Sequence, residues 1–151
     1  MSDHYIHVIP VDPNLLPPKA RREEAVAYFR KITADSDAVK ASTSTAPVFV
    51  HCGANFNEVR CPACNKPIEI ETWREWMQQD STAKGFKLPA HVMTCCGARR
   101  NLNDLLYDWP QGFARCRISA MNPNIRKLSA KQIALFAEIL ATPIRVIYEH
   151  V

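Results

Sequence analysis

Two cysteine pairs constrain this chain more than any other feature of its sequence. The first pair is Cys61-Pro-Ala-Cys64 and the second is Cys95-Cys96. Two residues between cysteines let both sulfurs face one metal ion, and a second pair at this distance is typical of a zinc ribbon with an inserted helix. We therefore expect a Zn²⁺ site whose ligands are Cys61, Cys64, Cys95 and Cys96.

The residues that follow each pair favour tight turns. Adjacent cysteines in a regular strand point to opposite faces, so Cys95 and Cys96 can share an ion only if the chain turns there. Gly97 permits that turn, and Asn65 after the first pair also tolerates a positive φ. Both pairs are thus predicted to lie in turns rather than within strands.

Two other residues are candidates for the fourth ligand. His91 or Cys52 could replace Cys95, since each lies near one of the pairs in the sequence. Cys52 is in phase with Val48 and Val50 in a predicted strand, which favours a buried core thiol. Cys116 alternates with small and apolar residues and is expected to pack in the core.

The expected ion is structural rather than catalytic or redox-active. A thioredoxin-like site needs a helix that begins at the first cysteine, and Pro67 disfavours a helix there. A catalytic zinc keeps one position open for water, whereas four thiolates close the coordination shell.

Basic residues near the cysteines are candidates for contacts to the metal site or to a partner. Arg115 and Arg117 lie on the strand face opposite Cys116, and their charge suits an acidic partner or simply solvent. The other four basic residues lie close to the cysteine pairs in the sequence. They either partly neutralise the negative charge of the metal site or form a solvated surface. The six residues are Arg60, Lys66, Arg99, Arg100, Arg115 and Arg117.

The pattern of apolar residues predicts one α+β domain over residues 1–151, with 60–100 as a zinc-binding unit. We expect a mainly antiparallel sheet, two to three packed helices and a zinc-ribbon-like insertion. Capping boxes at Thr72–Glu75 and Ser129–Gln132 predict two helix starts. Trp73 and Trp76 share a helix face that favours a core over a base-stacking platform. Strands are predicted at 4–9, 47–52, 90–94, 113–121 and 144–151, a first helix at 19–33, and a loop at 34–46.

Composition and charge narrow the class of function. The formal charge is +4, and four thiolates around one Zn²⁺ bring it to about +2. The sequence contains no dense cluster of Lys and Arg residues of the kind that nucleic-acid-binding proteins usually have. The beginning of the chain lacks the pattern of a secretory signal, and no apolar stretch is long enough to span a bilayer. We expect a cytoplasmic protein without a membrane partner, in a reducing environment that keeps cysteines free.

Several segments together resemble a family of small, uncharacterised bacterial proteins. They are the CPxC pair, Thr94-Cys-Cys-Gly97, the stretch Leu102–Arg115 with its DWPxGFAR-like turn, and Asn122-Pro123. The likeness runs from about residue 47 onward, with Asn65 where Gly is more usual and Met93 where Pro is commoner. The resemblance supports the four-cysteine set, and it implies no activity because the family has none assigned.

Three functions remain open at this point. The first is a zinc-stabilised protein that recognises a protein partner, for example an immunity protein that neutralises a toxin, or an adaptor. The second is a nucleic-acid-binding zinc ribbon. The third is an enzyme, which we do not expect because no catalytic arrangement stands out; a cleft holding His51 or His91 beside a carboxylate would favour it.

Overall fold

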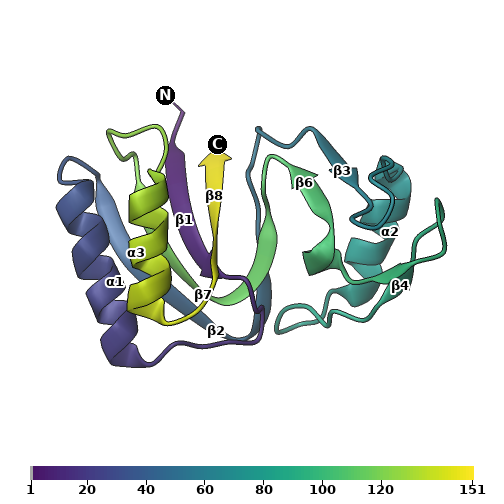
Figure 1. Cartoon of the computed structure of the whole chain (residues 1–151), viewed down its shortest axis with the longest axis horizontal. Coiled ribbons are helices and arrows are strands. Elements are labelled where there is room, and N and C mark those ends of the chain that lie inside the picture. The colour runs from purple at the N-terminus through teal and green to yellow at the C-terminus, as the bar shows by residue number, and fades with distance from the viewer. Residues whose placement is uncertain (1) are drawn as a thin grey trace.

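The computed structural model describes residues 2–151 and contains one four-stranded antiparallel sheet in the order β2-β7-β1-β8. This confirms the predicted α+β class (Figure 1). The sheet strands are β1 (His4–Pro10), β2 (Ala38–Val50), β7 (Gly112–Met121) and β8 (Ile144–His150). The helices are α1 (Lys19–Ile32), α2 (Ile70–Asp80) and α3 (Ala130–Leu140), with a 3₁₀ turn η1 (Leu102–Asp104).

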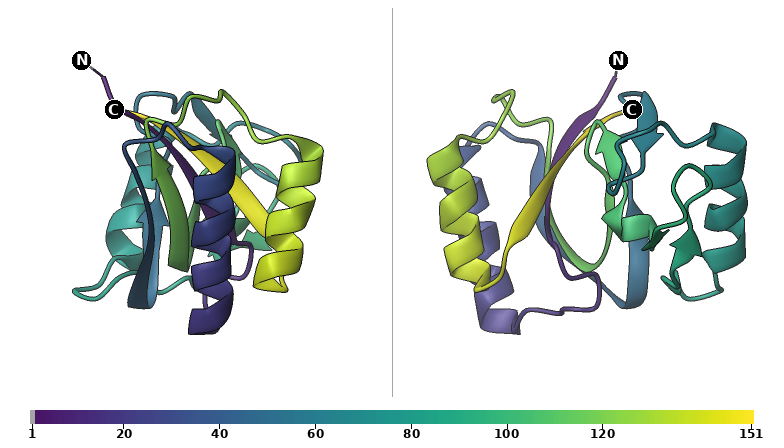
Figure 2. Two further views of the ribbon diagram at one scale, coloured as in Figure 1. Left: turned by 90° about the vertical axis from the view of Figure 1, so that its left-hand side faces the viewer. Right: turned by 45° about the vertical axis from the view of Figure 1, so that its right-hand side comes forward.

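Two helices cover one face of this sheet. The apolar side chains of α1 and α3 meet those of β1 and β7 in one buried cluster, in which Phe136 is fully buried. Its ring contacts Phe29 and Tyr28 edge-on, with centroids 5.1 and 5.0 Å away. The right-hand view in Figure 2 shows the sheet between these two helices and the insertion that holds α2.

The cysteine pairs lie in an insertion between two neighbouring strands. β2 pairs with β7, and residues 51–111 form the connection between them. The insertion holds α2 and two small antiparallel pairs: β3 (Glu58–Arg60) with β6 (Leu106–Asp108), and β4 (His91–Val92) with β5 (Arg99–Arg100). Its strands β3 and β6 reach just beyond the predicted bounds of 60–100.

The insertion shares its core with the sheet. Phe49 of β2 and Phe113 of β7 stack with centroids 5.1 Å apart, and Phe86 of the insertion contacts Phe113 edge-on at 5.0 Å. Trp76 of α2 and Met93 are buried in the same cluster. The insertion is therefore attached to the sheet by aromatic packing as well as by its two chain connections.

The predicted loop at 34–46 was wrong, because β2 begins at Ala38 and continues through this segment. Its run of Ser, Thr and Ala has no apolar alternation, and only Val39 is buried before Pro47. Pairing with β7 supplies the backbone hydrogen bonds that the local sequence does not predict. Pro47 lies where the register shifts, between Thr43 and Val48, a position that an edge strand tolerates.

One of the two predicted capping boxes is present. Ser129 accepts a hydrogen bond from the backbone of Gln132, whose side chain accepts one from the backbone of Ser129, as predicted. The other prediction was wrong, since α2 begins at Ile70 and no side chain caps it, leaving Thr72 inside the helix. No helix within residues 2–151 combines the length and apolar character needed to cross a membrane.

Candidate metal centre

The first cysteine pair lies in a tight turn after β3. The N–H of Cys61 donates to the carbonyl of Lys66 at 2.9 Å, and the N–H of Asn65 donates to the carbonyl of Cys61 at 2.8 Å. Asn65 has φ 64°, as predicted from its position after the pair. This turn directs the sulfurs of Cys61 and Cys64 to the same side.

The second pair lies in a turn with the same hydrogen-bond pattern. The N–H of Met93 donates to the carbonyl of Ala98 and the N–H of Gly97 to the carbonyl of Met93, both at 2.8 Å. Gly97 has φ 76°. Met93 therefore occupies the position that Cys61 has in the first turn, and Cys96 occupies that of Cys64. Cys95 supplies its sulfur from within the turn, which explains how adjacent cysteines reach one point.

The four predicted cysteines come together. Their sulfur atoms all lie within 4.8 Å of one another, with Cys64 Sγ 3.1 Å from Cys95 Sγ and Cys61 Sγ 3.8 Å from Cys96 Sγ. A tetrahedral ion with metal–sulfur bonds of about 2.3 Å requires sulfurs about 3.8 Å apart. A disulfide requires about 2.05 Å, and all six cysteines are free. The arrangement could hold one metal ion.

The environments of the four thiols differ. Although burial raises the pKa of Cys61, backbone N–H groups of Cys64 and Ala63 donate to its sulfur and lower that pKa to about 7. The hydrogen bond with Cys64, together with burial, raises the pKa of Cys95 to about 12. Cys61 is fully buried, whereas Cys96 is exposed, so the cluster reaches the protein surface on one side.

Neither alternative ligand belongs to this cluster. His91 Nε2 lies 2.7 Å from Asp80 Oδ2, and the His91 ring stacks on Trp76. Cys52 is fully buried in a separate apolar cluster and does not approach the other sulfurs. Cys116 lies in the core between the sheet and its helices, as predicted.

The six basic residues have no hydrogen bond to the cysteine sulfurs within residues 2–151. Arg60 instead donates to Glu58 and, at 2.9 Å, to the carbonyl of Asn65, which supports the first turn. Arg100 donates to the carbonyl of Arg99, and Arg115 to the carbonyl of Ser44. Their proposed roles toward a metal or a partner stay predictions. The side chains of Lys66, Arg99 and Arg117 form no hydrogen bond within the described residues.

The two tryptophans of α2 belong to the core of the insertion. Trp76 is 8% exposed, and Trp73 stacks on Phe56 with centroids 5.2 Å apart. The Trp73 indole N–H donates to the hydroxyl of Tyr107 at 3.1 Å. The preference for a core face over a base-stacking platform is confirmed.

A buried Ser–His–Glu network lies on the sheet and was not predicted. His7 Nδ1 is 2.7 Å from Ser119 Oγ, and His7 Nε2 is 2.7 Å from Glu149 Oε1. His7 and Ser119 are only 3% and 5% exposed, so the serine hydroxyl does not face a cleft. Its members lie on β1, β7 and β8, and only the strand register brings them together.

This network makes stability depend on pH. Burial lowers the pKa of His7, assisted by the charge of Arg117 and opposed by Glu149, while His51 also faces it. Protonation therefore favours the unfolded chain. The stabilising effect is complete above the ordinary histidine pKa of about 6.5 and is lost as the pH falls below it.

We expect His7→Gln to flatten this pH dependence, which urea unfolding between pH 5 and pH 8 measures. As the pH is lowered, the free energy of unfolding of the wild type should fall more steeply than that of His7→Gln. The two slopes should differ by up to about 1.4 kcal/mol per pH unit. His4→Gln is the matched control, because this exposed histidine is not among the groups that shift the pKa of His7. Equal slopes for wild type and His7→Gln would contradict the prediction.

A half-buried arginine ties the insertion to the sheet, and the sequence does not reveal it. Arg145 of β8 donates from Nη1 to the carbonyl of Gln111 at 2.9 Å and to Oδ1 of Asn103 at 3.1 Å, and Nη1 and Nη2 both reach the carbonyl of Asn103. No carboxylate pairs with it within the described part of the chain, and burial lowers its pKa. Asn103 in turn binds the backbone of Val11 and Phe113.

No protein-family model, no curated protein and no solved structure matches this chain. The resemblance to small bacterial proteins therefore stays a prediction that rests on the quoted motifs.

Proposed function

We propose that this chain is a zinc-stabilised binding protein that recognises a protein partner. The observation that carries the first half of the proposal is the group of four sulfurs within 4.8 Å of one another. Four thiolates suit Zn²⁺ and leave no ligand position for water, which favours a structural ion over a catalytic one. Iron is also bound by four cysteines in proteins, so metal analysis has to separate the two.

The second half rests on the free edge of β2. This strand pairs with β7 on one side and has no strand on the other within residues 2–151. Its exposed side chains include Ala41, Thr43 and Thr45, and Lys40 is the one charge between Ala38 and Pro47. Many proteins protect an edge strand with several charged residues, which prevent it from pairing with another chain. An edge strand with few charges can bind an extended peptide through main-chain hydrogen bonds.

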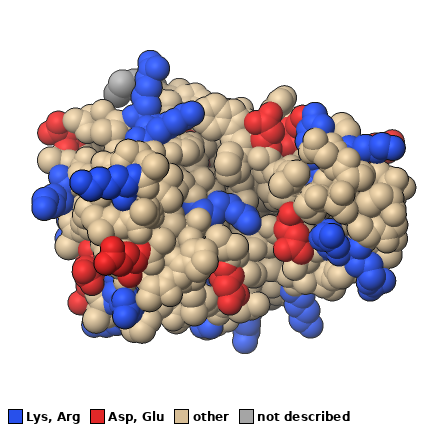
Figure 3. Space-filling model, in the orientation of Figure 1, with Lys and Arg blue, Asp and Glu red and all other residues tan. Residues whose placement is uncertain are grey.

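The charge pattern on one face of the molecule supports a protein partner better than nucleic acid. Lys and Arg side chains alternate with Asp and Glu over the face shown in Figure 3, without a continuous basic stripe. Nucleic-acid-binding surfaces concentrate basic residues along one groove or face. Six free cysteines are also suited to a reducing compartment, so the proposal includes a cytoplasmic location.

The experiment is affinity purification from the native host with the wild-type protein and with Thr43→Lys/Thr45→Lys. Two new charges on exposed positions of the edge should abolish recovery of a stoichiometric partner while leaving the melting temperature unchanged. Lys131→Glu, on an exposed position of α3 near the opposite edge of the sheet, is the matched control and should retain the partner. Metal analysis of the same samples should find one zinc per chain.

Two results would overturn the proposal. One is that the wild type recovers no stoichiometric protein. The other is retention on a nucleic-acid column that weakens steeply as salt rises, which would favour the nucleic-acid alternative. A partner that the edge variant still binds would keep the binding function and exclude β2 as its site.

A further inference from the structure

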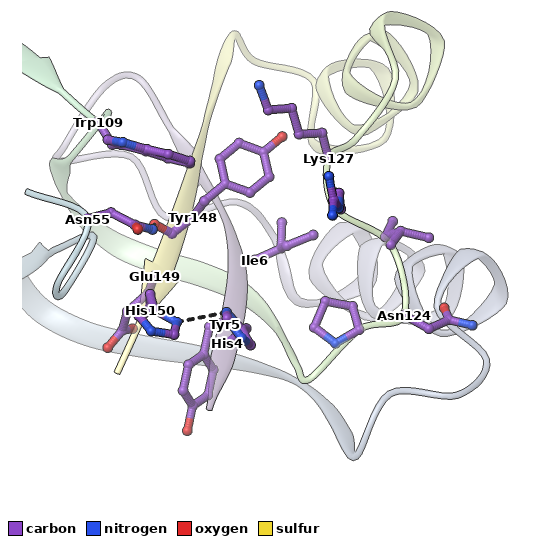
Figure 4. Close-up of a pocket in the computed structure, with 13 residues that line it drawn as sticks. His4, Tyr5, Ile6, Asn55, Trp109, Asn124, Lys127, Tyr148, Glu149 and His150 are labelled. Atoms are coloured by element: carbon purple, nitrogen blue, oxygen red, sulfur yellow. Dashed lines mark hydrogen bonds between the residues drawn. The ribbon is translucent and has the colours of Figure 1, made fainter. Parts of the chain in front are cut away.

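A cavity of about 680 Å³ lies away from the cysteine cluster and has no part in the proposed function. The beginning of β1 and the end of β8 form its floor, and the loop 123–127 forms one side. Trp109, which follows β6 of the insertion, forms the other side (Figure 4). Its volume falls within the range of about 300–1,000 Å³ that is usual for small-molecule sites.

The apolar wall of this cavity consists of two aromatic rings in edge-on contact. Trp109 is 39% exposed, although large apolar side chains are usually covered. Its ring meets Tyr148 edge-on, with centroids 6.5 Å apart. The Tyr148 hydroxyl accepts a hydrogen bond from the N–H of Leu128 at 3.1 Å, which fixes its ring against the loop. The wall therefore offers a preformed surface for a flat ring.

The opposite wall is basic. Arg126 and Lys127 are exposed and form no ion pair within residues 2–151. The acidic residue of the lining, Glu149, already holds His7 with one carboxylate oxygen, while the other lies 3.9 Å from His51. The net charge that faces a ligand is therefore positive.

The loop that carries these cations is anchored at its beginning by two asparagines and at its end by the hydrogen bond from the N–H of Leu128 to Tyr148. Asn122 donates to the carboxylates of Asp3 and Asp37, at 3.0 and 2.7 Å, and Asn124 donates to Asp35 at 2.8 Å. A loop held in this way presents its charges without a large ordering cost on binding. Figure 4 shows Lys127 across the cavity from Trp109, with Tyr148 between them.

We propose that this cavity binds a small organic anion that carries a flat aromatic ring. The ring lies against Trp109 and Tyr148, and the anionic group lies at Arg126 and Lys127. Aromatic contact supplies most of the buried area, and the cations select for negative charge. This site is independent of the metal and of the β2 edge.

The test compares two fluorescent probes that differ in charge. 1-Anilinonaphthalene-8-sulfonate is an anion that carries a flat naphthalene ring, and N-phenyl-1-naphthylamine is its uncharged counterpart without the sulfonate. The folded wild type should bind the sulfonate at one site per chain. Its affinity for the neutral probe should be lower by about tenfold or more. Arg126→Glu/Lys127→Glu should weaken sulfonate binding by about tenfold or more, and Trp109→Leu should also weaken it.

Lys84→Glu/Lys87→Glu is the control, since it makes the same change of charge at exposed positions outside the cavity. This control should bind the sulfonate as the wild type does, and all variants should keep the wild-type melting temperature. Equal sulfonate affinity in the wild type and in Arg126→Glu/Lys127→Glu would overturn the proposal. Equal affinity of the wild type for the two probes, or no binding at all, would also overturn it.

Discussion

Cys61→Ala should lose the metal and unfold the insertion. Cys61 contributes the fully buried sulfur of the cluster, and its backbone closes the first turn. Binding of a structural zinc contributes folding free energy directly, on the order of 10 kcal/mol in zinc-finger peptides. We therefore expect the zinc content to fall from one per chain to near zero. Fluorescence of Trp73 and Trp76, which lie in the core of the insertion, should shift to the red.

Cys116→Ala is the matched control, because it removes a buried thiol that lies far from the cluster in the core beneath α1 and α3. It should keep one zinc per chain and the wild-type tryptophan emission. Chelation of the wild type should reproduce the spectrum of Cys61→Ala. A Cys61→Ala protein with full zinc content and unchanged emission would contradict the assignment, as would a wild type that contains no metal when purified without chelators.

Arg145→Met should destabilise the protein by about 2–4 kcal/mol. The substitution keeps most of the apolar stem but removes donors to the carbonyls of Asn103 and Gln111, which lie in a buried setting. Each unsatisfied buried acceptor costs about 1–3 kcal/mol. The midpoint of urea unfolding measures the loss, and the zinc content should not change, because Arg145 does not touch the cysteines.

The control for this prediction is Arg99→Met, which removes an exposed guanidinium and should change stability by less than about 0.5 kcal/mol. Arg145→Lys should lie between wild type and Arg145→Met, since one ammonium group cannot reach all the acceptors at once. Wild-type stability for Arg145→Met would show that water replaces the guanidinium without cost.

The sequence predicts those features that depend on a few neighbouring residues. The positive φ at Asn65 and at Gly97 follows from the residue types after each cysteine pair, and both are present. The helix that begins after Ser129 has its capping box. Convergence of the two turns also follows, since each cysteine pair alone offers only two sulfurs to an ion that takes four.

Features that depend on strand register are hidden from a reading of the sequence. His7, Ser119 and Glu149 are distant in the chain, and none has a neighbour that suggests a hydrogen-bond network. Arg145 has the pattern of a solvated strand residue, yet it binds the insertion. The strand at Ala38–Ala46 is polar, and its conformation comes from β7 rather than from its own residues. In each example, contacts between residues far apart in the sequence determine the observed structure.

The position of β1 has a consequence for synthesis on the ribosome. β1 leaves the ribosome before the other strands of the sheet, yet its neighbours are β7 and β8, which emerge much later. Both cysteine turns and the paired strands β3 and β6 lie before residue 109, whereas Phe113 of β7 completes the core that they share. All four cysteines therefore emerge before β7 supplies Phe113, while β1, with its apolar residues Ile6, Val8 and Ile9, still awaits its partners.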